Sequence, residues 1–444
     1  MRMSPNGGFT AVRDALPRLE EALSPTVGIV THTVATTHAT DEASLPNCAC
    51  SLASAQRTLG APSVEYGSGA HPDPRRARAA ALGEAIERYA GVYLPNGAIG
   101  IATARGLGAL AVRPARFALF DETQFEVPGF PFVPFTEDTP TTFVEGVHLA
   151  DGSLAALPAE LVYLRPPRSP HPPVGYATSS GLACGPTEDE AILAAFLELV
   201  ERDAVMLAWK CRLSLPRLDW SDDASITMLD GRFFAHTGLR LSVLDASCFL
   251  DLPVTISVLH GHVGSGAALA VGAAAAATIE EAWLKAVAEC FGVYRWLRQR
   301  ASDTRDRQVI EPDDVESFDD HMLFYAGAGR GELADFLVGS SERRATGDVS
   351  PLGGSTPRAQ IQALTARLAV HGTSAYAVDV TSPDVRELGL SVARVIAPEL
   401  CALDVSHRAR FLGGPRLRTA AHEAGLTDGP LGLAELNPWP HPFP

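Results

Sequence analysis

Glutamate and arginine side chains recur in one pattern, Glu-x-x-Glu-Arg, at residues 84–88 and again at residues 198–202. Each copy follows an Ala- and Leu-rich run of helical character, and positions i, i+3 and i+4 of a helix lie on one face. Each copy is therefore expected to point two carboxylates and a guanidinium in one direction beside an apolar surface. Two such clusters could hold a hard cation and a polyphosphate between them.

The second copy extends upstream to Glu190, which lies about two turns before Glu198 and about three turns before Glu201 at roughly 3.6 residues per turn. These three carboxylates are therefore expected near one helix face. Like charges on a common face repel one another, and Mg²⁺ binds carboxylates together with phosphate oxygens and water. The alternative is a solvated helix face with an internal ion pair. The repeat and the added Glu190 favour a magnesium site.

Three helices must position these acids, and the sequence predicts them over about 74–91, 187–210 and 278–300. The second helix begins with Thr187 as a plausible N-cap and Glu190 at the capping-box position. The third helix carries one lysine and one glutamate that are candidate site residues, Lys285 and Glu289, one turn apart.

Five segments rich in β-branched or apolar residues are predicted to be strands. They are 28–37, 239–246, 254–259, 374–380 and 391–396. The proline-rich stretch 100–170 predicts loops and edge strands, and residues 179–185 predict a turn. Helices and strands interleave irregularly, which indicates a mixed α/β (α+β) fold.

The predicted organisation has three consecutive parts, and the main one contains an insertion. Residues 1–27 form an N-terminal lead-in, and residues 28–436 form the main domain. Within that domain, the polar stretch 301–356 is interpreted as an insertion or lid. Residues 437–444 form a proline-rich tail.

Composition excludes several classes of function. The net charge of −16 over 444 residues argues against a nucleic-acid-binding surface. It does not exclude ATP, because Mg²⁺ can reverse a local acidic field. The sequence contains neither a signal-peptide pattern nor a transmembrane segment. Seven cysteines without framework spacing are consistent with a reducing cytoplasm. A cytoplasmic protein with no nucleic-acid or membrane partner is therefore predicted.

Nucleotide-binding loops are absent from the sequence. A Walker A loop needs Gly-Lys followed by Ser or Thr, and the two lysines, Lys210 and Lys285, follow Trp209 and Leu284. No Gly-x-Gly-x-x-Gly sequence follows a predicted strand. If the chain binds a nucleotide, it does so at an acidic site centred on magnesium.

The tail has proline at every second position from Pro438 to Pro444. Such a segment cannot join a helix or a central strand and must be extended, close to polyproline II. Trp439, His441 and Phe443 stand between the prolines, and burying aromatic rings would anchor the tail. We expect the tail to dock in the cleft near the nucleotide, with Pro444 close to the γ-phosphate.

The chain resembles the YcaO family from about residue 28 to residue 444. The segments that carry the resemblance are ALGEAIERYAG (81–91), SSGLACGPTEDEAILAAFLELVERDAVMLAW (179–209), EEAWLKAVAEC (280–290), VDVTSPDVRELGLSVARVIAPEL (378–400) and HRARFLGGPRL (407–417). The resemblance implies an ATP-binding fold with internally repeated helix–strand units. It also implies that ATP activates a backbone amide of a peptide for nucleophilic attack.

The resemblance implies which residues bind ATP and Mg²⁺. The implied metal and phosphate ligands are the glutamates Glu84, Glu87, Glu190, Glu198, Glu201 and Glu289. Arg88 and Arg202 would support phosphates or fix the glutamates, and Lys285 would be a basic residue of the ATP site. The chain departs from the family pattern at Ala80 and Ala282, where serine is expected, and at Gly292 or Val293, where glutamine is common.

A C-terminal Pro-x-Pro-x-Pro resembles the azoline-forming branch, the cyclodehydratases of thiazole/oxazole-modified peptides. In the implied reaction, a substrate Cys, Ser or Thr side chain attacks the preceding backbone carbonyl. The resulting oxyanion takes the γ-phosphoryl group of ATP, phosphate leaves and the azoline ring closes. The implied proton acceptor is the carboxylate of Pro444 or the ring of His441.

The resemblance also implies partners. They are a ribosomal precursor peptide, a separate E1-like protein that holds the leader peptide, and an FMN-dependent dehydrogenase; a homodimer is the expected assembly. Three alternatives remain open at this point. The chain could form thioamides, form macroamidines, or act as a non-catalytic nucleotide-binding regulatory subunit.

Overall fold

The computed structural model describes residues 8–95, 100–165, 169–263, 266–300, 309, 311–326 and 330–444. The chain divides into two compact units. The first unit comprises Met1–Thr36, Pro46–Leu199 and Gly353–Leu400, and the second comprises Thr37–Leu45, Val200–Leu352 and Cys401–Pro444. One long helix, α6 (Glu188–Lys210), begins in the first unit and ends in the second.

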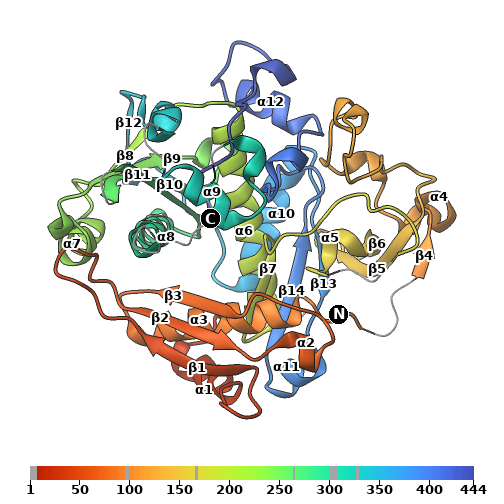
Figure 1. The fold of residues 1–444 in the computed structure, drawn as a ribbon, viewed down its shortest axis with the longest axis horizontal. Helices are drawn as coiled ribbons and strands as arrows, with labels where there is room; N and C mark the ends of the chain where they lie inside the picture. Colours follow the sequence, from red (N-terminus) through yellow and green to blue (C-terminus); the bar gives the residue numbers. More distant parts are fainter. Residues whose placement is uncertain are drawn as a thin grey trace. The chain divides into compact units, whose positions relative to one another are not determined.

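The first unit contains two sheets and helices of different lengths, which can be followed in Figure 1. Its other elements are α1 (Val12–Glu21), β1 (Val30–Ala35), β2 (Asn47–Leu52), α2 (Ala55–Thr58), β3 (Tyr66–Ala70), α3 (Pro74–Ala90), β4 (Gly100–Ala102), α4 (Ala104–Leu107), β5 (Thr141–His148), β6 (Leu154–Pro158), α5 (Ala159–Val162), β7 (Leu182–Gly185), α10 (Pro357–Val370), β13 (Tyr376–Asp379), α11 (Pro383–Glu387) and β14 (Ser391–Ile396).

Helix α3 lies at the centre of the first unit's core. The strands form one sheet of order β1-β2-β3 and another of order β4-β5-β13-β14-β7, with β6 paired to β5. Ala85 and Ile86 of α3 share one apolar cluster with Cys50 of β2 and Val392 of β14. Asp73 caps the helix by accepting a hydrogen bond from the backbone of the second helical residue. The helix that carries the first acidic copy is therefore held by both sheets.

The second unit is built on one sheet of order β11-β10-β9-β8-β12. Its elements besides α6 are β8 (Arg217–Asp219), α7 (Ala224–Phe233), β9 (Arg240–Asp245), β10 (Val254–Val263), β11 (Gly266–Ala275), α8 (Ile279–Arg300), α9 (Phe318–Phe324), β12 (Arg343–Ala345) and α12 (Arg416–Glu423). The strands are antiparallel except for β12, which runs parallel to β8. Helix α8 packs on β10 and β11 (Figure 1).

Each unit contains a hairpin followed by a long helix, β2-β3-α3 in the first and β10-β11-α8 in the second. In both copies a strand glycine lies against the helix backbone. A Cβ on Gly67 would lie 2.6 Å from the carbonyl oxygen of Ala81, and one on Gly272 would lie 2.5 Å from that of Ala286. This correspondence confirms the implied repeat of helix–strand units. It relates α3 to α8, whereas the repeated sequence pattern lies on α3 and α6.

Most predicted elements are present with bounds shifted by a few residues. The three acidic helices are α3, α6 and α8, and the five predicted strands are β1, β9, β10, β13 and β14. Three interpretations differ from the structure. Residues 182–185 form strand β7, which pairs with β14, where a turn was predicted. The Ala- and Gly-rich β11 was not predicted as a strand. Strand β5 has neighbours on both sides, so it is no edge strand.

The segment predicted as an insertion or lid contains regular structure in its described part. Helix α9 buries Met322 and Phe324, and β12 completes the sheet of the second unit. The tail, 437–444, forms neither helix nor strand, as its prolines predict.

Candidate functional site

The first acidic copy forms a compact charge cluster on α3. Arg88 Nη2 lies 3.2 Å from Glu84 Oε1, and Arg88 Nε lies 3.7 Å from Glu87 Oε1. Glu84 Oε2 also accepts hydrogen bonds from the backbone and side chain of Ser68 in β3, at 2.8 and 3.3 Å. The spacing predicted from the sequence is thus realised, and strand β3 fixes the direction of Glu84.

Glu87 is a mostly buried acid of α3. Its side chain is 14% exposed. Burial raises the pKa of Glu87 well above its usual value, Arg88 and Arg394 lower it, and the nearby carboxylates Glu198 and Glu84 raise it further. The structure therefore brings Glu87 of α3 into the field of Glu198 of α6. A cation among these acids would relieve both the desolvation and the repulsion.

Glu198 is oriented by a backbone turn of the first unit. Its Oε2 accepts a hydrogen bond from the amide of Gly181, at 3.1 Å. Gly181 has a φ of 78°, and a Cβ there would lie 2.6 Å from the carbonyl oxygen of Val395. Only glycine meets both conditions without strain. The turn before β7 thus supplies the donor that holds this glutamate.

Arg394 is a buried cation that the sequence analysis did not single out. It lies on β14, donates from Nη1 to the carbonyl of Thr178 at 2.6 Å and from Nη2 to that of Leu161 at 3.1 Å. Burial lowers the pKa of Arg394 to about 10, while Glu198 and Glu87 raise it. An arginine in the otherwise apolar strand 391–396 was the available signal.

Glu190 occupies the first turn of α6, where Thr187 caps the helix as predicted. The hydroxyl of Thr187 donates to Glu190 Oε2 at 2.8 Å and accepts from the Glu190 amide at 3.3 Å. Thr10 donates to the same carboxylate from its backbone and its hydroxyl, at 2.7 and 2.8 Å. Glu190 therefore ties the N-terminal segment to α6, and a metal would have to replace some of these donors.

The second unit carries the remaining acids. On α6, Arg202 Nη2 lies 3.4 Å from Glu201 Oε1, and both side chains are 12% exposed. On α8, Glu289 Oε2 accepts a hydrogen bond from the amide of Ala273 in β11, at 2.7 Å. Glu289 and Ala273 are 16 residues apart, as are Glu84 and Ser68 in the first unit. The repeat thus places one glutamate in the same way in each unit.

The two lysines have opposite environments. Lys210, at the end of α6, is 1% exposed, and its Nζ lies 3.0 Å from Asp404 Oδ1 and 2.8 Å from the carbonyl of Phe411. Lys285 is exposed on α8, one turn before Glu289. Lys210 is therefore structural, whereas the side chain of Lys285 is open to solvent.

The tail is seated in the second unit by its backbone carbonyls. At its start, the backbone amide of Asn437 donates a hydrogen bond to the carbonyl oxygen of Lys210 at 2.7 Å. Buried side chains of the unit form hydrogen bonds with the carbonyl oxygens of the next three residues. These pairs are Trp209 with Trp439, Tyr325 with Pro440 and His321 with His441. Phe443 is fully buried. Of the three rings expected to anchor the tail, those of His441 and Phe443 are buried, and that of Trp439 is half-buried.

His441 is a poor proton acceptor in this setting. Its Nε2 lies 2.8 Å from the carbonyl of Asp404, and its Nδ1 accepts from the amide of Phe443 at 3.3 Å. Burial lowers the pKa of His441 well below its usual value, and His321 and Arg202 lower it further. A neutral ring that donates from Nε2 and accepts at Nδ1 satisfies both contacts. The geometry therefore gives His441 a holding role and leaves Pro444 as the candidate acceptor.

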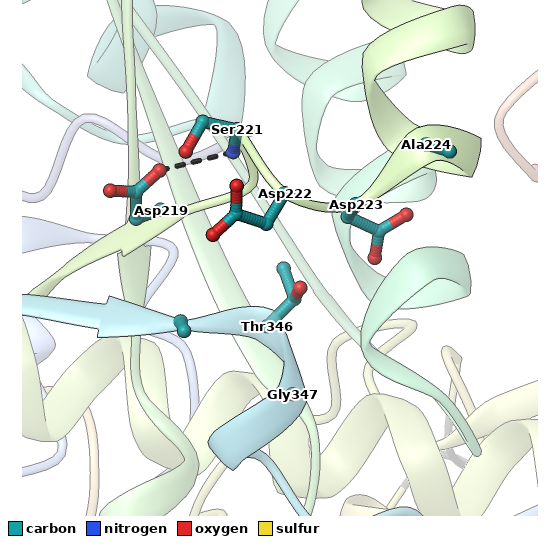
Figure 2. Close-up of a pocket in the computed structure, with 8 residues that line it drawn as sticks. Asp219, Ser221, Asp222, Asp223, Ala224, Thr346 and Gly347 are labelled. Carbon is teal, nitrogen blue, oxygen red and sulfur yellow. Dashed lines mark hydrogen bonds between the residues drawn. The ribbon is translucent and has the colours of Figure 1, made fainter.

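A hollow of about 480 Å³ lies elsewhere in the second unit, between the end of β8 and the start of α7 (Figure 2). Its lining is acidic and polar: Asp219, Ser221, Asp222, Asp223, Ala224, Ala345, Thr346 and Gly347. Asp219 Oδ1 accepts from the amide of Ser221 at 3.0 Å (Figure 2). None of the predicted ligands lines this hollow.

Within the described residues, His, Cys, Asp and Glu side chains nowhere gather in a set of three able to hold a metal ion by themselves. Also within the described ranges, no helix has the length and apolar character needed to cross a membrane.

Comparison with known proteins gives a consistent set of relatives. The family model described as YcaO cyclodehydratase, ATP- and Mg²⁺-binding, matches residues 68–401, a range that contains every predicted ligand glutamate. A heterocyclase solved in complex with substrate and cofactor is similar to this chain with a TM-score of 0.80 at 24% identity, covering 98% of this chain and 57% of its own.

Two further structures share the fold. The heterocyclase TruD has a TM-score of 0.68 at 27% identity, with 83% of this chain and 51% of its own covered. YcaO from Methanopyrus kandleri, bound with AMPPCP and Mg²⁺, has a TM-score of 0.60 at 18% identity, with 95% of this chain and 96% of its own covered. The chain thus spans little more than half the length of the two heterocyclases.

Proposed function

Because the chain belongs to the YcaO family, whose model matches residues 68–401, we propose that it is an ATP- and Mg²⁺-dependent cyclodehydratase. Its substrates are Cys, Ser or Thr residues of a ribosomal precursor peptide, which it converts to azolines. The observation that carries this proposal is the seating of the proline tail among buried donors of the second unit, together with the acids of α3, α6 and α8.

The residues present fit Mg²⁺ and ATP. Glu87 is a buried acid beside Glu84 and Glu198, and a divalent cation would relieve its desolvation. The residues that would hold the metal are Glu84, Glu87, Glu190, Glu198, Glu201 and Glu289. Arg88, Arg202 and Lys285 would contact the phosphates. When bound, the nucleotide supplies the phosphoryl group that turns the amide oxygen into a leaving group.

The chain's own groups contribute by holding the glutamates and the C-terminal carboxylate in position. Ser68, Gly181 and Ala273 fix three of the glutamates through backbone amides. Fixed dipoles and charges of this kind favour one binding geometry without reorganisation. The carboxylate of Pro444 accepts the proton of the attacking thiol or hydroxyl. Its neighbour Phe443 is buried, which restricts where that carboxylate can lie.

The assembly is part of the proposal. The peptide is presented by a separate E1-like protein that binds the leader, and an FMN-dependent dehydrogenase can oxidise the azolines afterwards. The chain acts in the cytoplasm as a homodimer.

Peptide mass spectrometry tests the proposed function. The chain, MgATP, a Cys-rich precursor and the E1-like partner are combined, and each ring removes about 18 Da as water. The tail is tested by deleting residues 440–444, which should lower ring formation far more than ATP affinity. Binding of ATP with neither hydrolysis nor mass loss would favour the regulatory alternative. A product with sulfur in place of oxygen would show thioamide formation and overturn the azoline assignment.

A further inference from the structure

His321 of α9 lies at the centre of the tail's seat and has no role in the reaction described so far. It is 1% exposed. Its Nδ1 lies 2.9 Å from the carbonyl oxygen of His441, and its Nε2 lies 3.0 Å from that of Val405. Its ring stacks on the ring of His441 with centroids 3.7 Å apart and an interplanar angle of 9°. His321 thus bridges the tail and the 401–406 segment.

The two carbonyls compete for the protons of His321. Burial lowers the pKa of its ring, opposed by Asp404, Asp320 and the two carbonyl contacts. A neutral imidazole has one N–H and can donate to one of the two oxygens at a time. The Nδ1–H tautomer bonds the tail, and the Nε2–H tautomer bonds Val405 instead.

The contact with His441 is well placed to control the end of the chain. In the described part of the chain, the His441 carbonyl is the acceptor nearest to Pro444 that a side chain from outside the tail binds. Beyond it, Pro442 and Pro444 have no N–H, and the amide of Phe443 bonds the ring of His441. The direction of the last three residues therefore depends on the carbonyl and ring of His441, and His321 contacts both.

We propose that His321 is the positioning residue of the tail: as its Nδ1–H tautomer it holds the His441 carbonyl and stacks on the His441 ring, which fixes the carboxylate of Pro444 for proton acceptance. The inference rests on the proposed function, because it concerns the same reaction. His321 touches neither substrate nor nucleotide in this assignment and acts through the tail.

Two substitutions separate the two tautomers. Asparagine places an N–H near the position of Nδ1, and glutamine places one near that of Nε2. His321→Asn should therefore keep the tail seated, whereas His321→Gln should bond Val405 and release it. For His321→Gln we expect kcat for ring formation to fall by about tenfold, the size of one lost buried hydrogen bond, with KM for ATP unchanged. His321→Phe, which keeps only the stacking, should behave like His321→Gln.

Hydrogen exchange of the C-terminal peptide gives a readout that does not depend on activity. Trp439, His441 and Phe443 supply its only amides between the prolines. Their exchange should be faster in His321→Gln than in wild type and near wild type in His321→Asn. His422→Gln is the matched control, because His422 Nδ1 also contacts a backbone carbonyl, that of Thr427 at 3.0 Å, away from the tail. It should change neither readout.

Equal effects of His321→Asn and His321→Gln, or wild-type kcat and exchange in both, would overturn the inference. If deletion of residues 440–444 abolishes ring formation while His321→Gln does not slow it, the proposed function stands and the inference fails. If the deletion leaves ring formation intact, the catalytic role of the tail fails instead. The exchange measurement then still decides whether His321 holds the tail.

Discussion

A single buried carboxylate shows how the acidic site is balanced without metal. Glu87 is mostly buried, and its pKa is raised because burial and two neighbouring carboxylates oppose its charge. Arg88 on the same helix and Arg394 on β14 offset part of this cost. Removing the charge of Glu87 should therefore affect binding and stability in opposite directions.

Glu87→Gln tests that balance. We expect the affinity for ATP in the presence of Mg²⁺ to fall roughly 10- to 100-fold, the range seen when a metal-site contact is lost. Without metal, the melting temperature should rise slightly, because burial and two neighbouring carboxylates disfavour the charge that is removed. Calorimetric titration and thermal unfolding measure the two effects. Glu21→Gln on the exposed face of α1 is the control, and unchanged ATP affinity in Glu87→Gln would remove this residue from the site.

At the residue scale, the sequence predicted the acids but not their partners. The Glu-x-x-Glu-Arg spacing follows from helix geometry, so Glu84, Glu87 and Arg88 could be grouped without a structure. The contacts of Arg394 and His321 join residues far apart in the chain. No local period encodes such contacts, and they became visible only through the pairing of β14 and the path of the tail.

The hairpin–helix repeat depends on close packing at one glycine per copy. A Cβ on Gly67 or Gly272 would lie closer than 3.0 Å to helix backbone atoms, which cannot move aside. Gly67→Ala and Gly272→Ala should each destabilise the fold by about 1–3 kcal/mol, the usual cost of overpacking. Gly83→Ala on α3 meets open space and should stabilise by about 0.5–1 kcal/mol. Denaturant unfolding measures all three, and equal effects at Gly67 and Gly83 would contradict the packing argument.

The docked tail should be sensitive to acid. Burial lowers the pKa values of His321 and His441, and it lowers that of His407 to about 3. Released histidines bind protons below their usual pKa of about 6.5, whereas the docked ones stay neutral. Docking is therefore fully favourable above pH 6.5 and weakens as the pH falls. Exchange of the C-terminal amides, corrected for intrinsic rates, should show loss of protection between pH 7.5 and about pH 5.5. Greater protection in acid would show the opposite linkage.

At the element scale, long helices were the easiest features to predict. For helices α3, α6 and α8, the length of the segment, its capping residues and its periodicity all predict a helix. Strand β11 is nearly all Ala, Gly and Val, and the first two have low strand propensity, so its identity comes from pairing with β10. The local sequence of β7 predicts a turn, and the segment forms a strand because it pairs with β14.

At the scale of the molecule, one helix carries acids into both units. Helix α6 holds Glu190 and Glu198 in the first unit and Glu201 in the second. Yet the chain covers only 57% and 51% of the two heterocyclases it resembles. The predicted ligand glutamates thus lie in a chain that covers little more than half of those relatives.

The lone chain should process a precursor peptide poorly. Mass spectrometry should show little loss of about 18 Da per ring until an E1-like partner that binds the leader is added. ATP consumption should rise together with ring formation when the partner is added, because each ring uses one γ-phosphoryl group of ATP. Efficient leader-dependent dehydration by the chain alone would show that a leader-binding element exists within it.

Because one of the two lysines is buried and the other is exposed, the chain can be labelled selectively at a single lysine side chain. Lys210 is buried against Asp404, whereas Lys285 is exposed on α8. Apart from the α-amino group, an amine-reactive dye should therefore attach at one side chain, one turn from Glu289. If Lys285 contacts phosphate as proposed, MgATP should slow this labelling, and the dye should then report nucleotide occupancy without any peptide substrate.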